Sequence, residues 1–136
     1  MLRLPAAVLL FTAVSLSADD TTSPKKFVGE WQAKVKDKVV CTIRVNSADP
    51  VSGQSESCNI NVDANGDLRE PASDSQTEET VSPMVNPEVK GSTLRFEEND
   101  GGDVLKFEFT LIADGKAELK IVNAPIAVKP IAFTRQ

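Results

Sequence analysis

Two of the residue types that most often do chemistry in proteins are missing from this chain. The 136-residue sequence contains no histidine and no tyrosine, two common sources of general acids, bases and metal ligands. A nucleophilic triad with histidine is impossible, so only a serine–lysine dyad or a carboxylate pair remains. No spacing singles out such a pair, and nothing marks a carboxylate as buried. We therefore predict no catalytic residue and a protein that is not an enzyme.

The two cysteines, Cys41 and Cys58, are the other reactive side chains. Cys41 shares one face of a predicted strand with apolar residues up to Val45, and Cys58 does the same up to Val62. The turn-rich connector 47–53 predicts that the two strands form an antiparallel hairpin. A redox or metal-binding pair is disfavoured because the C-x-x-C spacing is missing. We predict a structural disulfide between the two residues.

One stretch imitates the first half of a calcium-binding loop, with Asn61, Asp63 and Asn65-Gly66 at alternate positions. However, its first ligand position is a neutral asparagine, and Ala72 stands where a bidentate glutamate is required. A type I′ turn at Asn65-Gly66 explains the same letters. We predict no metal ligand and no cofactor.

The chain begins with the features of a secretory signal peptide. A positive start at Arg3 precedes an apolar run, and a small-residue stretch ends at Ala18. We predict a signal peptide over 1–18, a flexible leader over 19–26 and one domain over 27–136, secreted or periplasmic, monomeric and without a membrane anchor. The 15 basic and 20 acidic residues give a net charge of −5, which disfavours nucleic acid as a partner.

Alternation of apolar and polar residues at strand period dominates the predicted domain. The clearest case runs over 105–111 and continues, after Asp114-Gly115, over 117–121. Asp-Gly between two alternating runs is a strong hairpin signal. Leu94 and Phe96 mark a strand before this hairpin. Phe27, Trp31 and the residues that alternate with them predict the first strand of the domain.

Two segments depart from this regular alternation. The last strand is predicted to begin at Ile126 and Val128 and to shift phase around Pro130, which indicates a bulge or an edge position. The segment from Leu68 to Ser82 is polar and acidic, which predicts an exposed, solvated loop. The remaining strands, in meander order, must close or form two layers to hide their edges. We predict an all-β fold: an antiparallel up-and-down β-barrel of about eight strands, with room for one short helix.

Both ends of the domain resemble lipocalin-like barrels. Gly29-Glu30-Trp31 is similar to the G-x-W opening of that family, and Arg135 stands where the family has a late basic residue. The resemblance implies that Arg135 covers the Trp31 ring as a cation–π contact and seals one end of the barrel. Gly29, Trp31 and Arg135 would then be structural residues. The chain also resembles small exported bacterial domains of unknown function.

A second resemblance is to the periplasmic inhibitors of bacterial metalloproteases, which are small eight-stranded barrels with one disulfide. Gly29-Glu30-Trp31-Gln32 and Cys41 match that layout. In that family an N-terminal arm enters the protease cleft. The resemblance implies that residues 19–26 would have this role here.

These observations predict an exported, noncatalytic binding module. Its first candidate partner is a small or apolar molecule inside or at the mouth of the barrel, with Phe96, Phe107 and Phe109 as the candidate lining residues. The alternative is a protein-interaction module, such as a secreted protease inhibitor. That module would use residues 19–26 or the acidic loop after Asp67.

Overall fold

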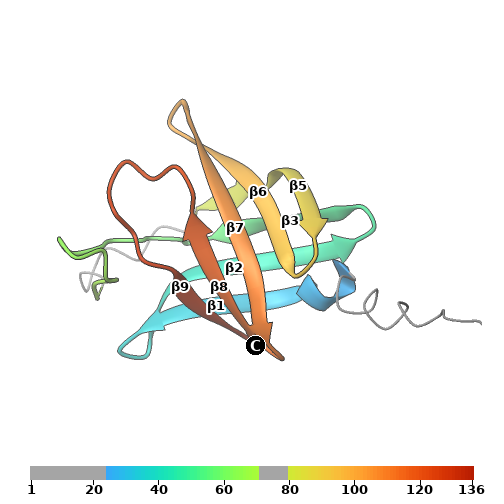
Figure 1. Ribbon diagram of the computed structural model, residues 1–136, viewed down its shortest axis with the longest axis horizontal. Helices are drawn as coiled ribbons and strands as arrows, with labels where there is room; N and C mark the ends of the chain where they lie inside the picture. Colours follow the sequence, from blue (N-terminus) through green and yellow to red (C-terminus); the bar gives the residue numbers. More distant parts are fainter. Residues whose placement is uncertain (1–23, 71–79) are drawn as a thin grey trace, which may run out of the picture.

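The computed structural model describes residues 24–70 and 80–136, which form one antiparallel sheet and one 3-10 turn. In chain order the elements are η2 (Pro24–Phe27), β1 (Gly29–Val35), β2 (Lys38–Ala48), β3 (Val51–Glu56), β4 (Val81–Pro83), β5 (Val85–Lys90), β6 (Thr93–Asp100), β7 (Asp103–Ala113), β8 (Lys116–Ile121) and β9 (Ile131–Arg135) (Figure 1). The predicted all-β fold is confirmed.

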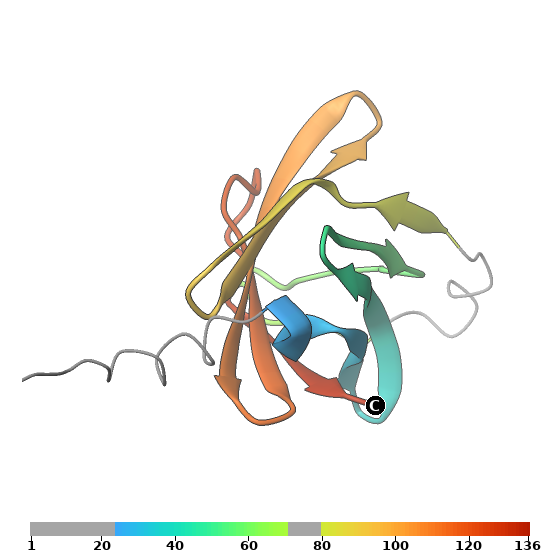
Figure 2. The ribbon, with the colours of Figure 1, turned by 90° about the vertical axis from the view of Figure 1, so that its right-hand side faces the viewer.

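The sheet curls into a nearly closed barrel (Figure 2). Its strand order is β4-β3-β2-β1-β9-β8-β7-β6-β5, so the two outermost strands are consecutive in the sequence. They meet at Met84, whose backbone N–H donates to the carbonyl oxygen of Gly53 on β3 at 2.9 Å. The next residue, Val85, already pairs with Glu97 of β6. One kinked stretch of chain therefore joins both edges of the sheet, and the predicted up-and-down barrel is confirmed.

An aromatic cluster fills the barrel around Trp31, which is fully buried. The Trp31 ring lies edge-on to Phe109, with 5.3 Å between ring centroids, and Phe109 lies edge-on to Phe133 at 5.4 Å. The Nε1–H of Trp31 donates to the carbonyl oxygen of Phe27 at 2.8 Å. The single polar atom of this large ring is thus satisfied inside the core. These aromatic side chains fill the interior of the barrel around Trp31.

The turn η2 covers one end of the barrel, on the right in Figure 1. The Cζ atom of Arg135 lies 4.6 Å from the Trp31 ring centroid, and the Arg135 guanidinium donates to the carbonyl oxygen of Lys26. This is the arrangement that the lipocalin-like resemblance implies. Gly29, at a φ of 138°, makes the left-handed bend from η2 into β1.

The sequence pattern predicts Phe27 on the first strand, and this prediction is wrong. Residues 24–26 of the predicted leader lie in the same element as Phe27. Residues Pro24–Phe27 form η2 instead, and Phe27 is only 1% exposed. Pro24 supplies the fixed φ that suits the start of a helical turn, and the buried Phe27 ring anchors its end. Residues 19–23 lie outside the described residues.

Cys58 does not continue the strand of the predicted hairpin. The hairpin itself is present, since β2 and β3 pair from Ala48↔Val51 to Thr42↔Glu56. Ser57 then adopts a φ of 48°, which turns the chain out of the ladder. Segment 57–62 that follows belongs to no strand, and only an isolated bridge joins Val62 to Leu68.

The turn that follows Val62 is not the predicted type I′ turn, because Gly66 is its only residue with a positive φ, at 88°. The Gly66 N–H donates to the carbonyl oxygen of Asp63 at 3.0 Å. The Asp63 carboxylate accepts the backbone N–H groups of Asn65 at 2.8 Å and Asp67 at 3.0 Å. These bonds, chiefly the one from Asp67, lower the pKa of Asp63. This side chain organises the turn through its backbone.

The last strand is shorter than the sequence pattern predicts. β9 begins at Ile131, whereas Ile126 is 62% exposed and Val128 lies in a loop over 122–130. Pro125 and Pro130 cannot donate to a strand ladder, so the chain between them is free to leave the sheet. The prediction of a bulged strand over this segment is wrong.

Candidate functional site

A pocket of about 520 Å³ opens at the end of the barrel opposite η2. In Figure 1 this is the left end, where segment 57–62 and loop 122–130 lie beside the strands. The apolar wall of the pocket comprises Cys58, Ile60, Val62, Leu105, Phe107, Ile121, Ala124, Pro125, Ile126 and Val128. The polar wall comprises Ser55, Asn59, Thr80, Ser82, Glu98, Asn99 and Asp100.

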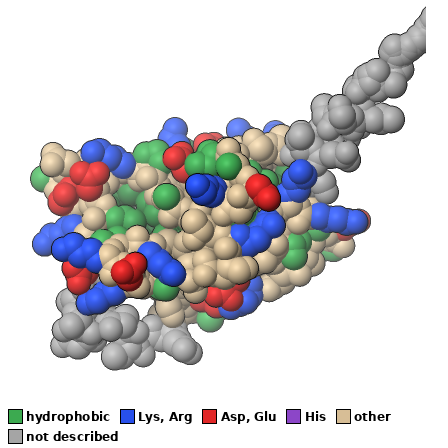
Figure 3. Space-filling model, turned by 90° about the horizontal axis from the view of Figure 1, so that it is seen from below, with side chains coloured by type: hydrophobic (Ala, Val, Ile, Leu, Met, Phe, Trp, Pro, Cys, Tyr) green, Lys and Arg blue, Asp and Glu red, His purple; other side chains and the backbone are tan. Residues whose placement is uncertain are grey.

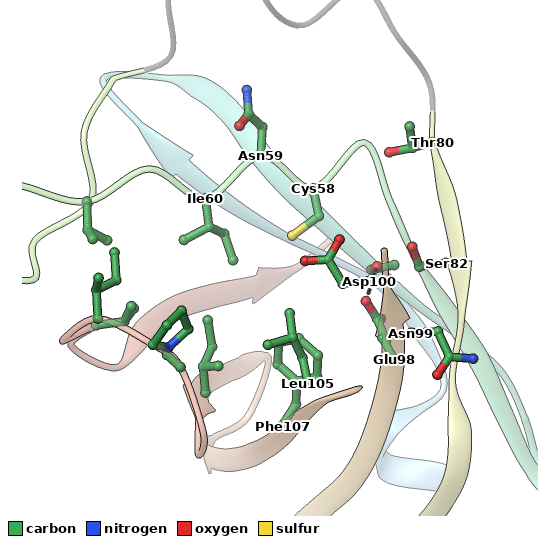
Figure 4. A pocket seen from close by; sticks show the side chains of 17 residues that line it. Cys58, Asn59, Ile60, Thr80, Ser82, Glu98, Asn99, Asp100, Leu105 and Phe107 are labelled. Atoms are coloured by element: carbon green, nitrogen blue, oxygen red, sulfur yellow. Dashed lines mark hydrogen bonds between the residues drawn. The ribbon is translucent and has the colours of Figure 1, made fainter. Parts of the chain in front are cut away.

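The period of the strands brings these two walls together. On β6 the inward positions are Leu94, Phe96 and Glu98, all buried, so the row changes from apolar to acidic as it reaches the pocket end. β7 pairs with β6 in register, Phe107 opposite Phe96 and Leu105 opposite Glu98. Figure 4 shows Leu105 and Phe107 on one side of the space, Ile60 across from them, and Glu98 and Asp100 on a third side.

Glu98 is the most unusual residue of the pocket, since its side chain is charged in type and only 8% exposed. Ser55 Oγ donates to its Oε1 at 3.0 Å, whereas Oε2 has no hydrogen-bond partner among the described residues. Burial raises the pKa of Glu98 to about 7, the bond from Ser55 opposes this rise, and the negative charge of Asp100 adds to it. A carboxyl group poised near neutrality in a pocket is a feature of functional sites.

Asp100 carries the second negative charge of the pocket. It ends β6, is exposed, and points toward the same space as Cys58 and Glu98 (Figure 4). Glu98 and Asp100 are the only charged side chains among the described residues that line the pocket. The pocket therefore combines an apolar wall with a polar wall whose charged side chains, among the described residues, are all acidic.

Loop 122–130 forms the outer wall of the pocket and is held at both ends. The Asn123 side chain accepts the N–H of Lys106 at 2.8 Å and donates to the carbonyl oxygen of Val104 at 2.9 Å, so it pairs with β7 as a strand residue would. At the other end of the loop, the N–H of Lys129 donates to the carbonyl oxygen of Gly66 at 2.9 Å. The loop is thus fixed to the sheet and to the turn at Gly66.

A disulfide joins Cys41 to Cys58, as the sequence analysis expects. Cys41 is fully buried on β2, and Cys58 lines the pocket. The N–H of Asn59 also donates to the carbonyl oxygen of Val40 at 2.7 Å. The disulfide and this hydrogen bond together fasten segment 57–62, one wall of the pocket, to the barrel.

The three aromatic residues expected to line a ligand site have different positions. Phe107 lines the pocket, and Phe96 stacks against it at 5.0 Å between ring centroids with an interplanar angle of 21°. Phe109 is fully buried against Trp31, away from the pocket. The structural residues Gly29, Trp31 and Arg135 lie at the opposite, η2 end.

Glu98 was not singled out from the sequence, and the expectation that no carboxylate is buried is wrong for this residue. Extending the Leu94–Phe96 alternation by one step reaches Glu98, so the signal was available. An acidic residue at an inward position of a strand is rare enough to mark a site.

The acidic segment after Asp67 is described only in part, because residues 71–79 lie outside the described residues. Glu70, the first acid of that segment, pairs with Lys38 at 3.1 Å and Lys36 at 3.4 Å across the β1–β2 turn. Its hydrogen bonds to these lysines, Lys38 first, lower the pKa of Glu70. At the far end of the segment, Ser82 lines the pocket.

The outer surface of the barrel is mixed in charge. On the face shown in Figure 3, basic and acidic side chains alternate, and apolar side chains gather toward the left end. Within 24–70 and 80–136, the structure contains no helix of the length and apolar character needed to cross a membrane. Comparison of the chain with protein-family models, curated proteins and solved structures finds no match.

Proposed function

We propose that this protein is an exported, noncatalytic binding module that takes a small, partly apolar ligand at the mouth of its barrel. The observation that carries the proposal is Glu98, buried beside an apolar-walled pocket with one carboxyl oxygen unpartnered. A buried polar atom without a partner costs about 1–3 kcal/mol. A ligand that supplies the missing hydrogen bond offsets that cost.

The size and lining of the pocket support the same proposal. Its volume of about 520 Å³ lies within the usual range for small-molecule sites, which combine apolar walls with a few polar groups. The aromatic cluster around Trp31 fills the barrel below, so the ligand would rest at the mouth rather than deep inside. The disulfide and the two hydrogen bonds of the Asn123 side chain hold two walls of the pocket in place. Less conformational entropy is therefore lost when a ligand binds.

Binding without catalysis is supported by the state of the nearest nucleophile. Ser55 is 6% exposed and its hydroxyl proton is directed to Glu98. It is therefore largely shielded from a substrate, and Glu98, the group that could act as its base, has no third group to orient it among the described residues. The lipocalin-like opening and closing motifs agree with a ligand-binding barrel.

The test is a titration with the neutral fluorescent probe N-phenyl-1-naphthylamine, whose emission rises in apolar surroundings. We expect saturable binding by the whole protein, and energy transfer to the probe from Trp31, the only tryptophan of the chain. Val128→Phe fills the pocket from its loop wall and should abolish binding. Val39→Phe makes the same substitution at an exposed position outside the pocket, and should bind as the natural protein does.

Two results would overturn the proposal. One is the absence of saturable binding of the probe to the natural protein. The other is equal binding by the Val128→Phe and Val39→Phe variants, which would place the probe elsewhere on the molecule.

A further inference from the structure

The polar edge of the pocket has one sign of charge. Glu98 is the buried acid and Asp100 the exposed one, and no lysine or arginine is among the described residues that line the pocket. We propose that the ligand is a cation, an ammonium group on an apolar body, with its head between Glu98 and Asp100. This inference rests on the proposed function and adds the chemical class of the ligand.

The two oxygens of Glu98 are used differently, which suits a ligand with several donors. Oε1 accepts the bond from Ser55, which fixes the side chain, and Oε2 is left to accept another. Oε2 is buried, so binding requires the soft terminal carboxyl torsion to rotate toward the pocket, and the rotatable Ser55 hydroxyl can follow Oε1. An ammonium group has three donors and no acceptor, and it can therefore bond Oε2 and Asp100 together.

The walls of the pocket fit an apolar body attached to that head. Leu105 pairs with Glu98 across β6 and β7, and Phe107 lies one step further inward. Val128 and Ile121 continue the apolar wall. An anionic head would meet two negative charges here, and a neutral head could bond a carboxylate but without the ion-pair attraction that an ammonium group adds.

Ligand charge should also couple to the protonation of Glu98. The pKa of this carboxyl is raised to about 7, mainly by burial, with Asp100 adding to the rise. The pocket residues facing it from β3, β4 and β7 are Ser55, Ser82 and Leu105, and none of them is charged. A bound ammonium would therefore be the nearest positive charge, and it would favour the ionised form. Binding should release a proton and strengthen as the pH rises.

The experiment compares three probes with one hydrocarbon chain and different heads: hexylamine, hexanol and hexanoate. Isothermal titration on the whole protein at pH 8 should show hexylamine binding about tenfold more tightly than hexanol, and hexanoate more weakly than either. For hexylamine the affinity should rise up to about tenfold between pH 6 and pH 8, because its amine stays protonated up to about pH 10.

Three variants locate the effect. Glu98→Gln should weaken hexylamine binding about tenfold at pH 8 and remove the pH dependence of that binding. Asp100→Asn should weaken hexylamine binding about threefold, as expected for a more exposed charge. Asp103→Asn is the matched control: it removes a negative charge from the same turn, outside the pocket, and should change affinity less than twofold.

The outcomes separate this inference from the proposed function. Hexanol or hexanoate binding as tightly as hexylamine would overturn the inference while leaving a ligand-binding pocket. Equal losses of hexylamine affinity in Asp103→Asn and Glu98→Gln would overturn the inference too. They would mean that the overall negative charge of this end of the protein attracts hexylamine, rather than a specific site. If the naphthylamine probe and all three heads fail to bind, the proposed function fails with it.

Discussion

Ser55 Oγ donates a hydrogen bond of 3.0 Å to Glu98 Oε1 and joins β3 to β6, two strands that are not neighbours in the sheet. The two residues are 43 positions apart in the chain. Their bond lies where the joined strands β4 and β5 bring the sheet edges together. Glu98 therefore has two roles. Its Oε1 atom makes a contact across the closure of the barrel, and the side chain as a whole forms part of the pocket wall.

The burial of Glu98 should make the protein less stable at high pH. Its pKa is 4.5 in the unfolded chain and about 7 in the folded one, so the folded state binds more protons between these values. Stability contributed by the protonated form is full below pH 4.5 and is lost as the pH rises through about 7, by about 3 kcal/mol in total. Urea unfolding at several pH values measures this slope.

The matching substitution is Glu98→Gln, which keeps an acceptor for Ser55 and cannot ionise. We expect it to stabilise the protein by about 3 kcal/mol at pH 8 and to change little at pH 4.5. Glu97→Gln, one position along β6 and so on the other face of the strand, is the control. If the free energy of unfolding differs between the natural protein and Glu98→Gln by the same amount at pH 4.5 and at pH 8, the raised pKa of Glu98 is contradicted.

The disulfide should contribute a large part of the stability. Cys41 and Cys58 are 17 positions apart, and closing a loop of this length is worth about 3 kcal/mol in the chain-entropy model. We expect the variant with both Cys41→Ala and Cys58→Ala to lose that amount in urea unfolding. Reduced natural protein, which keeps both sulfur atoms, should lose a similar amount. Equal stability of the reduced and oxidised protein would refute the contribution.

Removing the Arg135 guanidinium should loosen the closed end of the barrel. It covers Trp31 and bonds the Lys26 carbonyl, so Arg135→Ala should cost about 1–2 kcal/mol in unfolding followed by Trp31 fluorescence. Arg95→Ala is the control, because the ion pair that Arg95 makes among the described residues, with Glu108 at 3.6 Å, is exposed. Its loss should cost less than about 0.5 kcal/mol. Equal costs for both variants would contradict the role of Arg135.

The fold could be predicted because its information is local. The alternation over 105–121 and the Asp114-Gly115 turn specify a hairpin by themselves, and β7 and β8 pair as expected. The hairpin of Cys41 follows from the same kind of pattern. Two facts about a strand, its period and its turn, are enough for this level of structure.

The site could be predicted only in small part, because it depends on contacts between distant segments. Glu98 bonds Ser55 on β3, a strand that is not a neighbour of β6 in the sheet, and its own strand does not specify this contact. Val128 was read as a strand residue, yet it lies in a loop whose position is set by Asn123 and the turn at Gly66. Side chains that replace backbone partners in this way leave no periodic signal.

The hydrogen bonds of the Asn123 side chain should affect the ligand affinity of the pocket more than the stability of the barrel. Its side chain makes two hydrogen bonds to β7, at 2.8 and 2.9 Å, and these hold the start of loop 122–130. Asn123→Ala should lower the affinity for N-phenyl-1-naphthylamine about three- to tenfold and cost about 1 kcal/mol of stability.

Asn46→Ala is the matched control for that change. Asn46 is exposed on β2, bonds Gln54 at 3.1 Å and lies outside the pocket, so its loss should leave probe binding unchanged. Amide exchange at Lys106, whose N–H bonds to Asn123, should speed up in Asn123→Ala and not in Asn46→Ala. Unchanged affinity together with faster exchange would mean that the bond from Lys129 to Gly66 alone keeps the wall in place. The apolar body of the ligand would then depend on the far end of the loop, where Val128 lies.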